Sequence, residues 1–203
     1  YRDYKDLILH EKPDVVVIAT WTSTHRDIAI FAARNGVKGI VLEKPVASNP
    51  NHARQVIDAC AKSGVKLVIN HERRWDPRYI KVKEIIAQGV LGDLKCIYGN
   101  VLSRSAPVGD WREVLDEAGG GPLFHDGTHL VDMVRFFAGD VSVINGRVSR
   151  EDKRYASETT AAAMMVTESG VNVFMEAGGM RDYFNFVMDL QFEKGRIKID
   201  NSN

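Results

Sequence analysis

A glutamate and a lysine at the end of a short apolar run are the first candidates for chemistry. The run Gly39–Leu42 is followed directly by Glu43, Lys44 and Pro45. Runs of this kind are typical of buried strands in parallel sheets, and ligands bind beyond the carboxyl ends of such strands. Because burial readily changes the pKa of a lysine, Lys44 is a candidate proton carrier or hydrogen-bond donor. The alternative is a charged pair that simply meets solvent at the end of a strand.

A second candidate site follows the three glycines at residues 119–121. A helix is predicted over 123–137, and it would place His125, His129 and Asp132 on one face, because residues three and four apart are neighbours. Two histidines and a carboxylate are able to bind a metal ion, or one histidine acts as a general acid or base beside its neighbour. A pair of structural, hydrogen-bonded histidines is the third interpretation.

Two further polar stretches are candidates for ligand binding. Arg74 lies in the run His71–Trp75, directly after a predicted strand, where an arginine suits a phosphate or a carboxylate. An interdomain salt bridge is the alternative for this arginine. Trp111 and Arg112, in the loop before the glycines, are candidates to line a polar substrate pocket. A plain surface loop is the alternative there.

The elements that must position these residues alternate regularly in the first third of the chain. Apolar periodicity and turn residues predict the order β-α-β-α-β, with strands at about Val15–Ala19, Gly39–Leu42 and Val65–Ile69. A helix over 25–35 and another that starts at Asn49-Pro50 connect the strands. This alternation implies a parallel sheet with right-handed crossovers.

The second part of the chain has a different pattern. Two helices, over 77–88 and 123–137, accompany six strand patterns, most of them consecutive, which predicts an antiparallel sheet. We therefore expect two domains. Residues 1–73 form an α/β domain with a partial Rossmann-type sheet, and residues 74–203 form an α+β domain with an open, mostly antiparallel sheet.

One face of the second sheet is expected to stay uncovered and to mediate self-association. A single helix is too small to cover the alternating apolar positions of two of its strands, and an exposed apolar face ordinarily marks a partner surface. The positions predicted for this face are Ala161, Ala163, Met165, Val171, Val173 and Met175.

Composition argues against several classes of function. The 203 residues carry 27 basic and 27 acidic side chains, so the net charge of zero gives no electrostatic attraction to nucleic acid. No apolar run approaches the roughly 18 residues of a membrane span, and the first residues are too polar for a secretion signal. The two cysteines, Cys60 and Cys96, lie far apart, which predicts a reducing, cytoplasmic compartment.

The glycine pattern of a dinucleotide-binding turn does not occur where the β-α-β order would need it. No glycine precedes Gly36, so residues 1–35 contain no Gly-x-Gly-x-x-Gly turn. The glycines at 119–121 are no substitute, because they follow no strand of a βαβ unit. We therefore expect the sequence to be a fragment of a longer chain.

Five ordered motifs resemble the Gfo/Idh/MocA family of NAD(P)-dependent oxidoreductases. They are the strand and helix start at 14–25, Val41–Pro45, Asn70–Pro77, the turn at 89–94, and the glycine run with His129 and Asp132. The resemblance covers nearly the whole chain. It implies a dinucleotide domain, a sheet domain that holds substrate, and hydride transfer between NAD or NADP and a sugar, polyol or similar alcohol. It also implies a homo-oligomer, a dimer or a tetramer.

The same resemblance implies roles for individual residues. Lys44 is expected to contact the cofactor and the reacting hydroxyl, and His129 to contact the substrate as acid or base. Trp111 and Arg112 stay candidates for substrate contact. The cofactor is expected to lie near Thr20, Trp21, Glu43, Lys44 and Arg74.

One position departs from the family pattern. Many members carry an aspartate four residues before the histidine, where this chain has His125, and Asp126 follows one place later. Both residues therefore join Lys44 and His129 as candidate catalytic residues, in a dehydrogenase without a metal site. Two other functions stay open. One is a catalytically silent member that binds a sugar-like ligand or acts in assembly, and the other is a metal-dependent hydrolase that uses His125, His129 and Asp132.

Overall fold

The computed structural model describes residues 1–104, 109–110 and 114–201. They divide into two units, one of residues 1–70 and 114–119, the other of the described residues within 71–113 and 120–203. The order of the elements confirms the predicted fold class, α/β followed by α+β. Among the described residues, no helix combines the length and the apolar character needed to cross a membrane.

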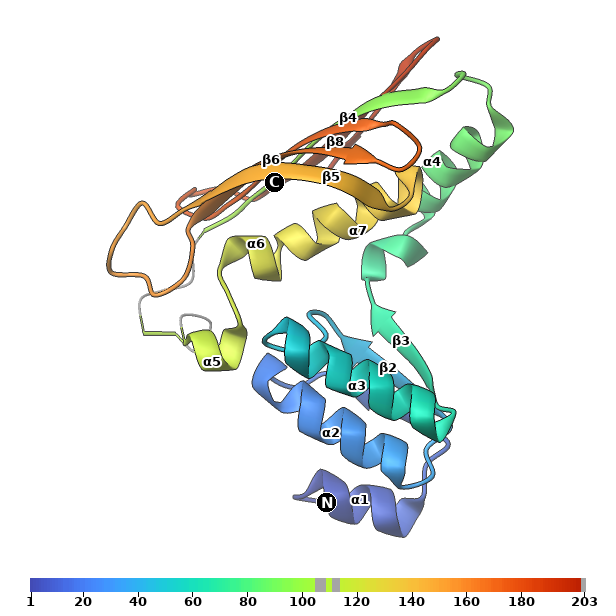
Figure 1. Ribbon diagram of the computed structural model, residues 1–203, viewed down its shortest axis with the longest axis vertical. Helices are drawn as coiled ribbons and strands as arrows, with labels where there is room; N and C mark the ends of the chain where they lie inside the picture. The colour runs from blue at the N-terminus through green and yellow to red at the C-terminus, as the bar shows by residue number, and fades with distance from the viewer. Residues whose placement is uncertain (105–108, 111–113, 202–203) are drawn as a thin grey trace. The chain divides into compact units, whose positions relative to one another are not determined.

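The first unit contains a parallel sheet and the helices that flank it. Its elements, in chain order, are α1 (Tyr4–Glu11), β1 (Val15–Ile18), α2 (Thr22–Arg34), β2 (Gly39–Glu43), α3 (Pro50–Ser63), β3 (Lys66–Asn70) and α5 (Leu115–Ala118). The strands lie in the order β1–β2–β3, and each neighbouring pair is parallel. Helices α2 and α3 lie side by side against this sheet (Figure 1). The carboxyl ends of β1 and β2 therefore meet at one edge, where Thr20 and Lys44 follow them.

Local sequence explains where α3 begins and ends. The side-chain oxygen of Asn49 accepts a hydrogen bond from the backbone N–H of His52 at 2.9 Å, and Pro50 occupies the first turn. Gly64 ends the helix with a φ of 69°, a left-handed conformation that glycine adopts without steric cost. The start of this helix is as the sequence predicts.

The second unit contains a six-stranded mixed sheet. Its elements are the 3₁₀ helix η1 (Glu72–Trp75), α4 (Pro77–Gln88), β4 (Leu94–Leu102), α6 (Pro122–His125), α7 (Gly127–Ala138), β5 (Val141–Ser149), β6 (Thr160–Thr167), β7 (Asn172–Gly178), β8 (Asn185–Phe192) and β9 (Arg196–Asp200). The strand order is β5–β6–β7–β4–β8–β9. The pair β4–β7 is parallel, and the other neighbouring pairs are antiparallel.

Helix α7 lies across the central strands of this sheet (Figure 1). Its buried apolar stripe consists of Leu130, Met133, Val134 and Phe137. The helix approaches β4 closely at Gly99, where an added Cβ would lie 2.6 Å from a methyl group of Leu130. Burial of each large apolar side chain contributes roughly 1.5–3 kcal/mol, so the stripe fixes the rotation of α7. That rotation places His129 and Asp132 beside η1.

The positions that the sequence assigned to the open face of this sheet lie instead on the face under α7. Met165, Val173 and Met175 are buried in the same core as the helix, so this expectation was wrong. The outward row carries Met164 and Phe174. Alternation along a strand separates the two faces, but it does not show which one a helix covers when both rows are apolar.

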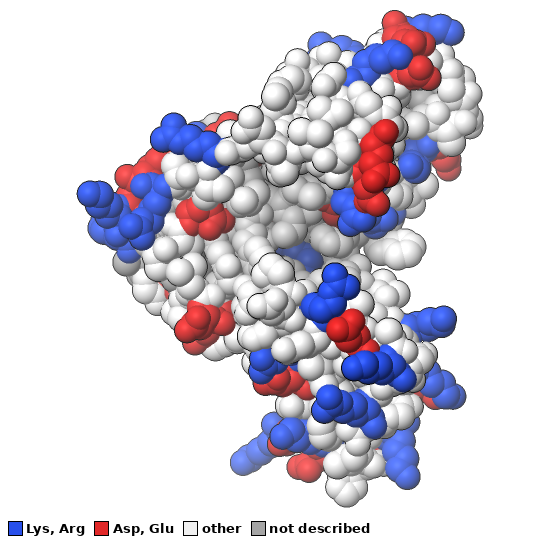
Figure 2. Space-filling view, in the orientation of Figure 1, with Lys and Arg blue, Asp and Glu red and all other residues white. Residues whose placement is uncertain are grey.

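Basic and acidic side chains are interspersed over both units on the face shown in Figure 2. Many form local ion pairs, as Lys38 does with Asp14 at 2.8 Å and Arg135 with Asp140 at 2.6 Å. Solvent screens exposed pairs of this kind, so each contributes little to stability. The surface in this view thus reflects the balanced composition of the chain.

Candidate active site

The helix that carries the two histidines is interrupted at Asp126. Helix α6 ends at His125 and α7 begins at Gly127, so the continuous helix that the sequence predicts is wrong in this detail. Gly127 packs tightly on the sheet, since an added Cβ would lie 3.1 Å from the Cβ of Ala177 in β7. His125 and His129 therefore belong to two successive helices and not to one face of a single helix.

The turn at Gly119–Gly121 is held by Glu158, which lies just before β6. The carboxylate of Glu158 accepts hydrogen bonds from the backbone N–H groups of Gly121 at 2.8 Å and Leu123 at 3.1 Å. Donors at a helix start have no partner within the helix, so this carboxylate stabilises the start of α6. An added Cβ at Gly121 would lie 2.0 Å from the carbonyl oxygen of Glu158. The close backbone approach that Gly121 allows is therefore to Glu158.

His129 is a buried side chain of α7, only 8% exposed. Its Nδ1 lies 3.4 Å from Oε2 of Glu72 in η1. The ring of His71 meets it edge-on, with 6.1 Å between the ring centroids and 88° between the planes. An imidazole that is largely removed from water and lies beside a carboxylate is suited to general acid–base chemistry.

Asp132, one turn further along α7, is bound by Arg74. The Nε and Nη2 groups of Arg74 donate to its two carboxylate oxygens, each at 2.8 Å. These hydrogen bonds raise the pKa of Arg74. His71 Nδ1 lies 3.9 Å from the same carboxylate. An interdomain salt bridge was one interpretation of Arg74, but the observed salt bridge joins η1 to α7 within the second unit. Contact of Arg74 with a cofactor stays a prediction.

Asp126 and His125 were the two candidates to replace the aspartate that many family members carry four residues before the histidine. Their side chains contact residues other than His129. Oδ2 of Asp126 accepts a hydrogen bond from the hydroxyl of Ser103, just after β4, at 2.9 Å. The ring of His125 lies edge-on to Phe124 at 6.1 Å. In the described part of the chain, no three His, Cys, Asp or Glu side chains come together as a metal site would require. The hypothesis of a metal-dependent hydrolase therefore has no support in this geometry.

Glu43 and Lys44 lie at the end of β2, as predicted. The side-chain amide of Asn70, at the end of β3, donates a hydrogen bond to Glu43. Lys44 is half-buried, and the peptide bond that joins it to Pro45 is cis. Both charged residues belong to the first unit, whereas His129 belongs to the second.

His25 joins the two loops that leave β1 and β2. The side chain is 1% exposed, with Nδ1 2.9 Å from the carbonyl oxygen of Pro45 and Nε2 3.0 Å from that of Thr20. A buried ring between two carbonyl groups fixes the distance between the loops and so helps to place Lys44. The sequence placed His25 at a helix start but gave no indication of these partners.

A groove of about 580 Å³ lies at the same edge of the first sheet. Among the residues that line it are Tyr4, Thr20, Trp21, Ser23 and Thr24. Helix α2 begins here at Thr22, three residues earlier than predicted, because the hydroxyl and the N–H of Thr24 both donate to the carbonyl of Trp21, at 2.7 and 2.9 Å. Two residues predicted to lie near the cofactor, Thr20 and Trp21, thus line one groove together.

Sequence reasoning missed three residues of the site on the second unit, around His129 and the glycine turn. Glu72 stood in a stretch noted only for its arginines, while no motif or spacing drew attention to Glu158 or Ser103. Their partners are distant in sequence, so periodicity carries no signal for them. The predicted substrate residues Trp111 and Arg112 lie outside the residues that the structure describes.

Comparison with known proteins places both halves of the chain in one family. Residues 1–71 match a model described as "Oxidoreductase family, NAD-binding Rossmann fold", and residues 79–198 match the GFO/IDH/MocA C-terminal domain. The D-apiose dehydrogenase of Paraburkholderia graminis is 32% identical over 180 residues, which are 84% of this chain and 45% of that protein. The inositol 2-dehydrogenase of Salmonella typhimurium is 27% identical over 203 residues, 98% of this chain and 58% of that protein.

A solved structure shows the same fold. Levoglucosan dehydrogenase, in complex with NADH and levoglucosan, superposes with a TM-score of 0.91 at 24% identity over 98% of this chain and 57% of that chain. This chain spans about half the length of the curated relatives it matches. The resemblance seen in the sequence motifs is confirmed, and the chain belongs to the GFO/IDH/MocA family of oxidoreductases.

Proposed function

We propose that the protein transfers a hydride between NAD or NADP and the carbinol carbon of a sugar, polyol or similar alcohol. The observation that carries this proposal is His129, a buried imidazole beside carboxylate groups on the helix after the glycine turn. Family membership supports it, because relatives of the chain are a D-apiose dehydrogenase and inositol 2-dehydrogenases.

We assign the cofactor to residues 1–73 and the substrate to residues 74–203. The groove beside Thr20 and Trp21 offers hydroxyl groups, an aromatic face and the N-terminus of α2, which suit ribose and phosphate groups. The residues present therefore fit part of a dinucleotide. Those that would hold it are Thr20, Trp21, Glu43 and Lys44 within residues 1–73, together with Arg74 directly beyond them.

The chemistry divides between the cofactor and the chain. When bound, the nicotinamide takes or gives the hydride. The hydroxyl proton must leave as the hydride does, so a base has to lie within hydrogen-bond reach of that oxygen. In this proposal His129 takes the proton at Nε2 and returns it in the reverse direction. The Lys44 ammonium stabilises negative charge on the oxygen, and Trp111 and Arg112 contact the rest of the substrate.

The proposal is tested by incubating the full-length protein with NAD or NADP and a panel that includes myo-inositol, levoglucosan and D-apiose. We expect the absorbance of reduced nicotinamide to appear with at least one polyol or sugar. Binding of a sugar without any turnover, measured by calorimetry, would instead support the catalytically silent alternative. One observation favours that alternative. Asp126, a candidate catalytic carboxylate, already accepts a hydrogen bond from the Ser103 hydroxyl at 2.9 Å.

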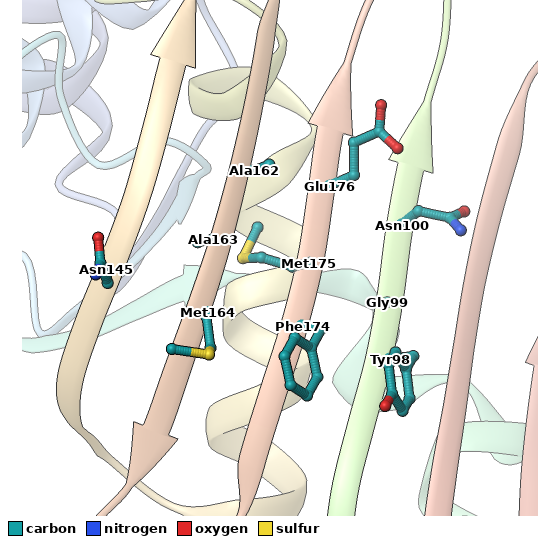
Figure 3. Close-up of a pocket in the computed structure, with 10 residues that line it drawn as sticks. All are labelled: Tyr98, Gly99, Asn100, Asn145, Ala162, Ala163, Met164, Phe174, Met175 and Glu176. Atoms are coloured by element: carbon teal, nitrogen blue, oxygen red, sulfur yellow. The ribbon is translucent and has the colours of Figure 1, made fainter.

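We also propose that the protein forms a homo-oligomer through the outward face of its second sheet. Tyr98 and Phe174 lie on neighbouring strands of this face, with ring centroids 5.0 Å apart and planes 14° from parallel, and Met164 lies next to Phe174 (Figure 3). Neutral amides flank the apolar row, and Glu176 is paired with Arg181 at 3.3 Å. The part of the face around Tyr98, Met164 and Phe174 thus presents mainly apolar and neutral groups to a second copy.

Replacing Phe174 with glutamate is expected to convert the oligomer to monomer at roughly tens of micromolar protein, because each copy would bury an unpaired carboxylate in the interface. Sedimentation velocity measures the change. Ile80→Glu on α4 is the matched control, since Ile80 is 38% exposed and Phe174 37%. A wild-type protein that is monomeric at this concentration would contradict the proposal, and so would a Phe174→Glu variant that stays oligomeric.

The compartment that we propose is the cytoplasm. Its support is the state of the two cysteines, which are both free thiols. Burial raises the pKa of Cys60, which keeps this thiol protonated and unreactive.

A further inference from the structure

Three carboxylates lie around His129, and two of them are committed to other partners. Asp132 receives both donors of Arg74 at 2.8 Å each. Asp126 accepts from the Ser103 hydroxyl at 2.9 Å. A backbone hydrogen bond joins Asp126 to His129, from the N–H of His129 to the carbonyl of Asp126 at 3.1 Å. The family's usual carboxylate position, four residues earlier, holds His125.

The third carboxylate, Glu72, faces the histidine. Its Oε2 lies 3.4 Å from Nδ1 of His129, and within the described residues this is the one ion pair that Glu72 makes. The contact joins η1 to α7, two elements of the same unit. Hydrogen bonds in active sites are often long before substrate binds and shorten in the complex. A distance of 3.4 Å is therefore a suitable starting geometry for a bond between Nδ1 and the carboxylate.

We propose that Glu72 is the positioning carboxylate of His129, so that η1 supplies the group that the catalytic helix lacks. When Nδ1–H of His129 donates to the Glu72 carboxylate, the imidazole keeps a fixed orientation and presents Nε2 to the substrate hydroxyl. Other His–carboxylate pairs orient an imidazole in the same way. The inference rests on the proposed function, because it deepens the role assigned to His129. Glu72 touches neither substrate nor cofactor in this scheme.

The charges near His129 fix the sign of the expected effect. His71 meets the ring edge-on at 6.1 Å, and the Arg74–Asp132 pair on the same side is neutral overall. Asp126 lies at the start of α7, three residues before His129. A carboxylate at Nδ1 stabilises the protonated imidazole, so removal of its charge makes His129 lose its proton at lower pH. Because the Glu72 side chain is 55% exposed, solvent screens the effect.

The first test follows the proton directly and needs no substrate. The imidazole resonances of the full-length protein are titrated by NMR, and His129 is assigned by its disappearance in His129→Ala. In Glu72→Gln we expect the midpoint of His129 to fall by about half to one pH unit. Glu84→Gln is the matched control, because its side chain is 52% exposed and it pairs with Lys81 on α4. An unchanged midpoint in Glu72→Gln would overturn the proposal.

The second test uses turnover. Glu72→Gln is expected to lower kcat about tenfold, with KM within about twofold, and to move the lower limb of the pH–kcat/KM profile to lower pH. Glu72→Asp, which keeps the charge, should recover part of the loss, whereas a purely structural role would give no such recovery. If Glu72→Gln turns over normally while His129→Ala does not, the proposal for Glu72 is wrong and the proposed function stands. If neither variant loses activity, His129 is not the base; the proposed function itself fails only if the wild-type protein shows no turnover with any substrate of the panel.

Discussion

Replacing His129 with alanine is expected to lower kcat by roughly two to four orders of magnitude. The hydroxyl of a carbinol loses its proton as the hydride leaves, and water is a poor base at neutral pH. An imidazole titrates near pH 6.5 when unperturbed, so it is matched to that task. The side chain is buried beside η1, and water that enters the space left by alanine is not held in position. Initial rates at saturating cofactor measure the loss.

Two neighbours of His129 serve as controls. Asp126→Asn keeps the size of the side chain and its acceptor for the Ser103 hydroxyl, so we expect kcat to change by less than about threefold. His125→Ala is expected to cost little, because its ring lies against Phe124. A loss in either variant as large as that in His129→Ala would assign the carboxylate's role to that position.

Replacing Lys44 with methionine is expected to lower kcat by roughly two to four orders of magnitude while the cofactor stays bound. Methionine keeps most of the apolar stem of the lysine but removes its ammonium group and thus its charge. One preorganised donor to a developing oxyanion is typically worth about 3–4 kcal/mol. Fluorescence titration with the reduced cofactor separates binding from turnover. Lys38→Met is the control, because this lysine pairs with Asp14 at the surface.

The two variants together decide the mechanism. If turnover survives both His129→Ala and Lys44→Met, neither proton transfer by the imidazole nor charge stabilisation by the ammonium contributes, and the proposed mechanism is wrong. Circular dichroism and thermal unfolding establish that each variant is folded, which matters most for buried His129.

Much of the fold could be predicted because its signals are local. Helix α3 begins at an asparagine-proline pair and ends at a glycine in the left-handed conformation, and both signals depend only on neighbouring residues. The apolar runs that become β1 and β2 are local signals as well. Thr20 and Lys44 follow the ends of these two runs. The edge of the first sheet, with its candidate residues, therefore follows from the sequence.

The site around His129 was harder to predict because its contacts join residues that are far apart in the sequence. Glu72 and His129 are 57 positions apart, and Arg74 and Asp132 are 58. No period of a helix or strand connects such pairs. The start of α6 also depends on a distant partner, because the Glu158 carboxylate accepts hydrogen bonds from the backbone N–H groups of Gly121 and Leu123. Residue types indicated the chemistry, whereas the partner of each residue became visible only in three dimensions.

The place of β4 in the second sheet has a consequence for the chain while it is being synthesised. Cys96 in this strand pairs with Asn172 in β7 and Gln191 in β8, which lie 76 and 95 residues further along. At about 5–20 residues per second, the ribosome needs roughly 4–15 s to supply the first of these partners. Both hydrogen-bonding edges of β4 stay open during that interval, although α7 is complete much earlier and can already cover one face. The nascent protein thus carries an open template for wrong strand pairing until β7 and β8 have left the ribosome.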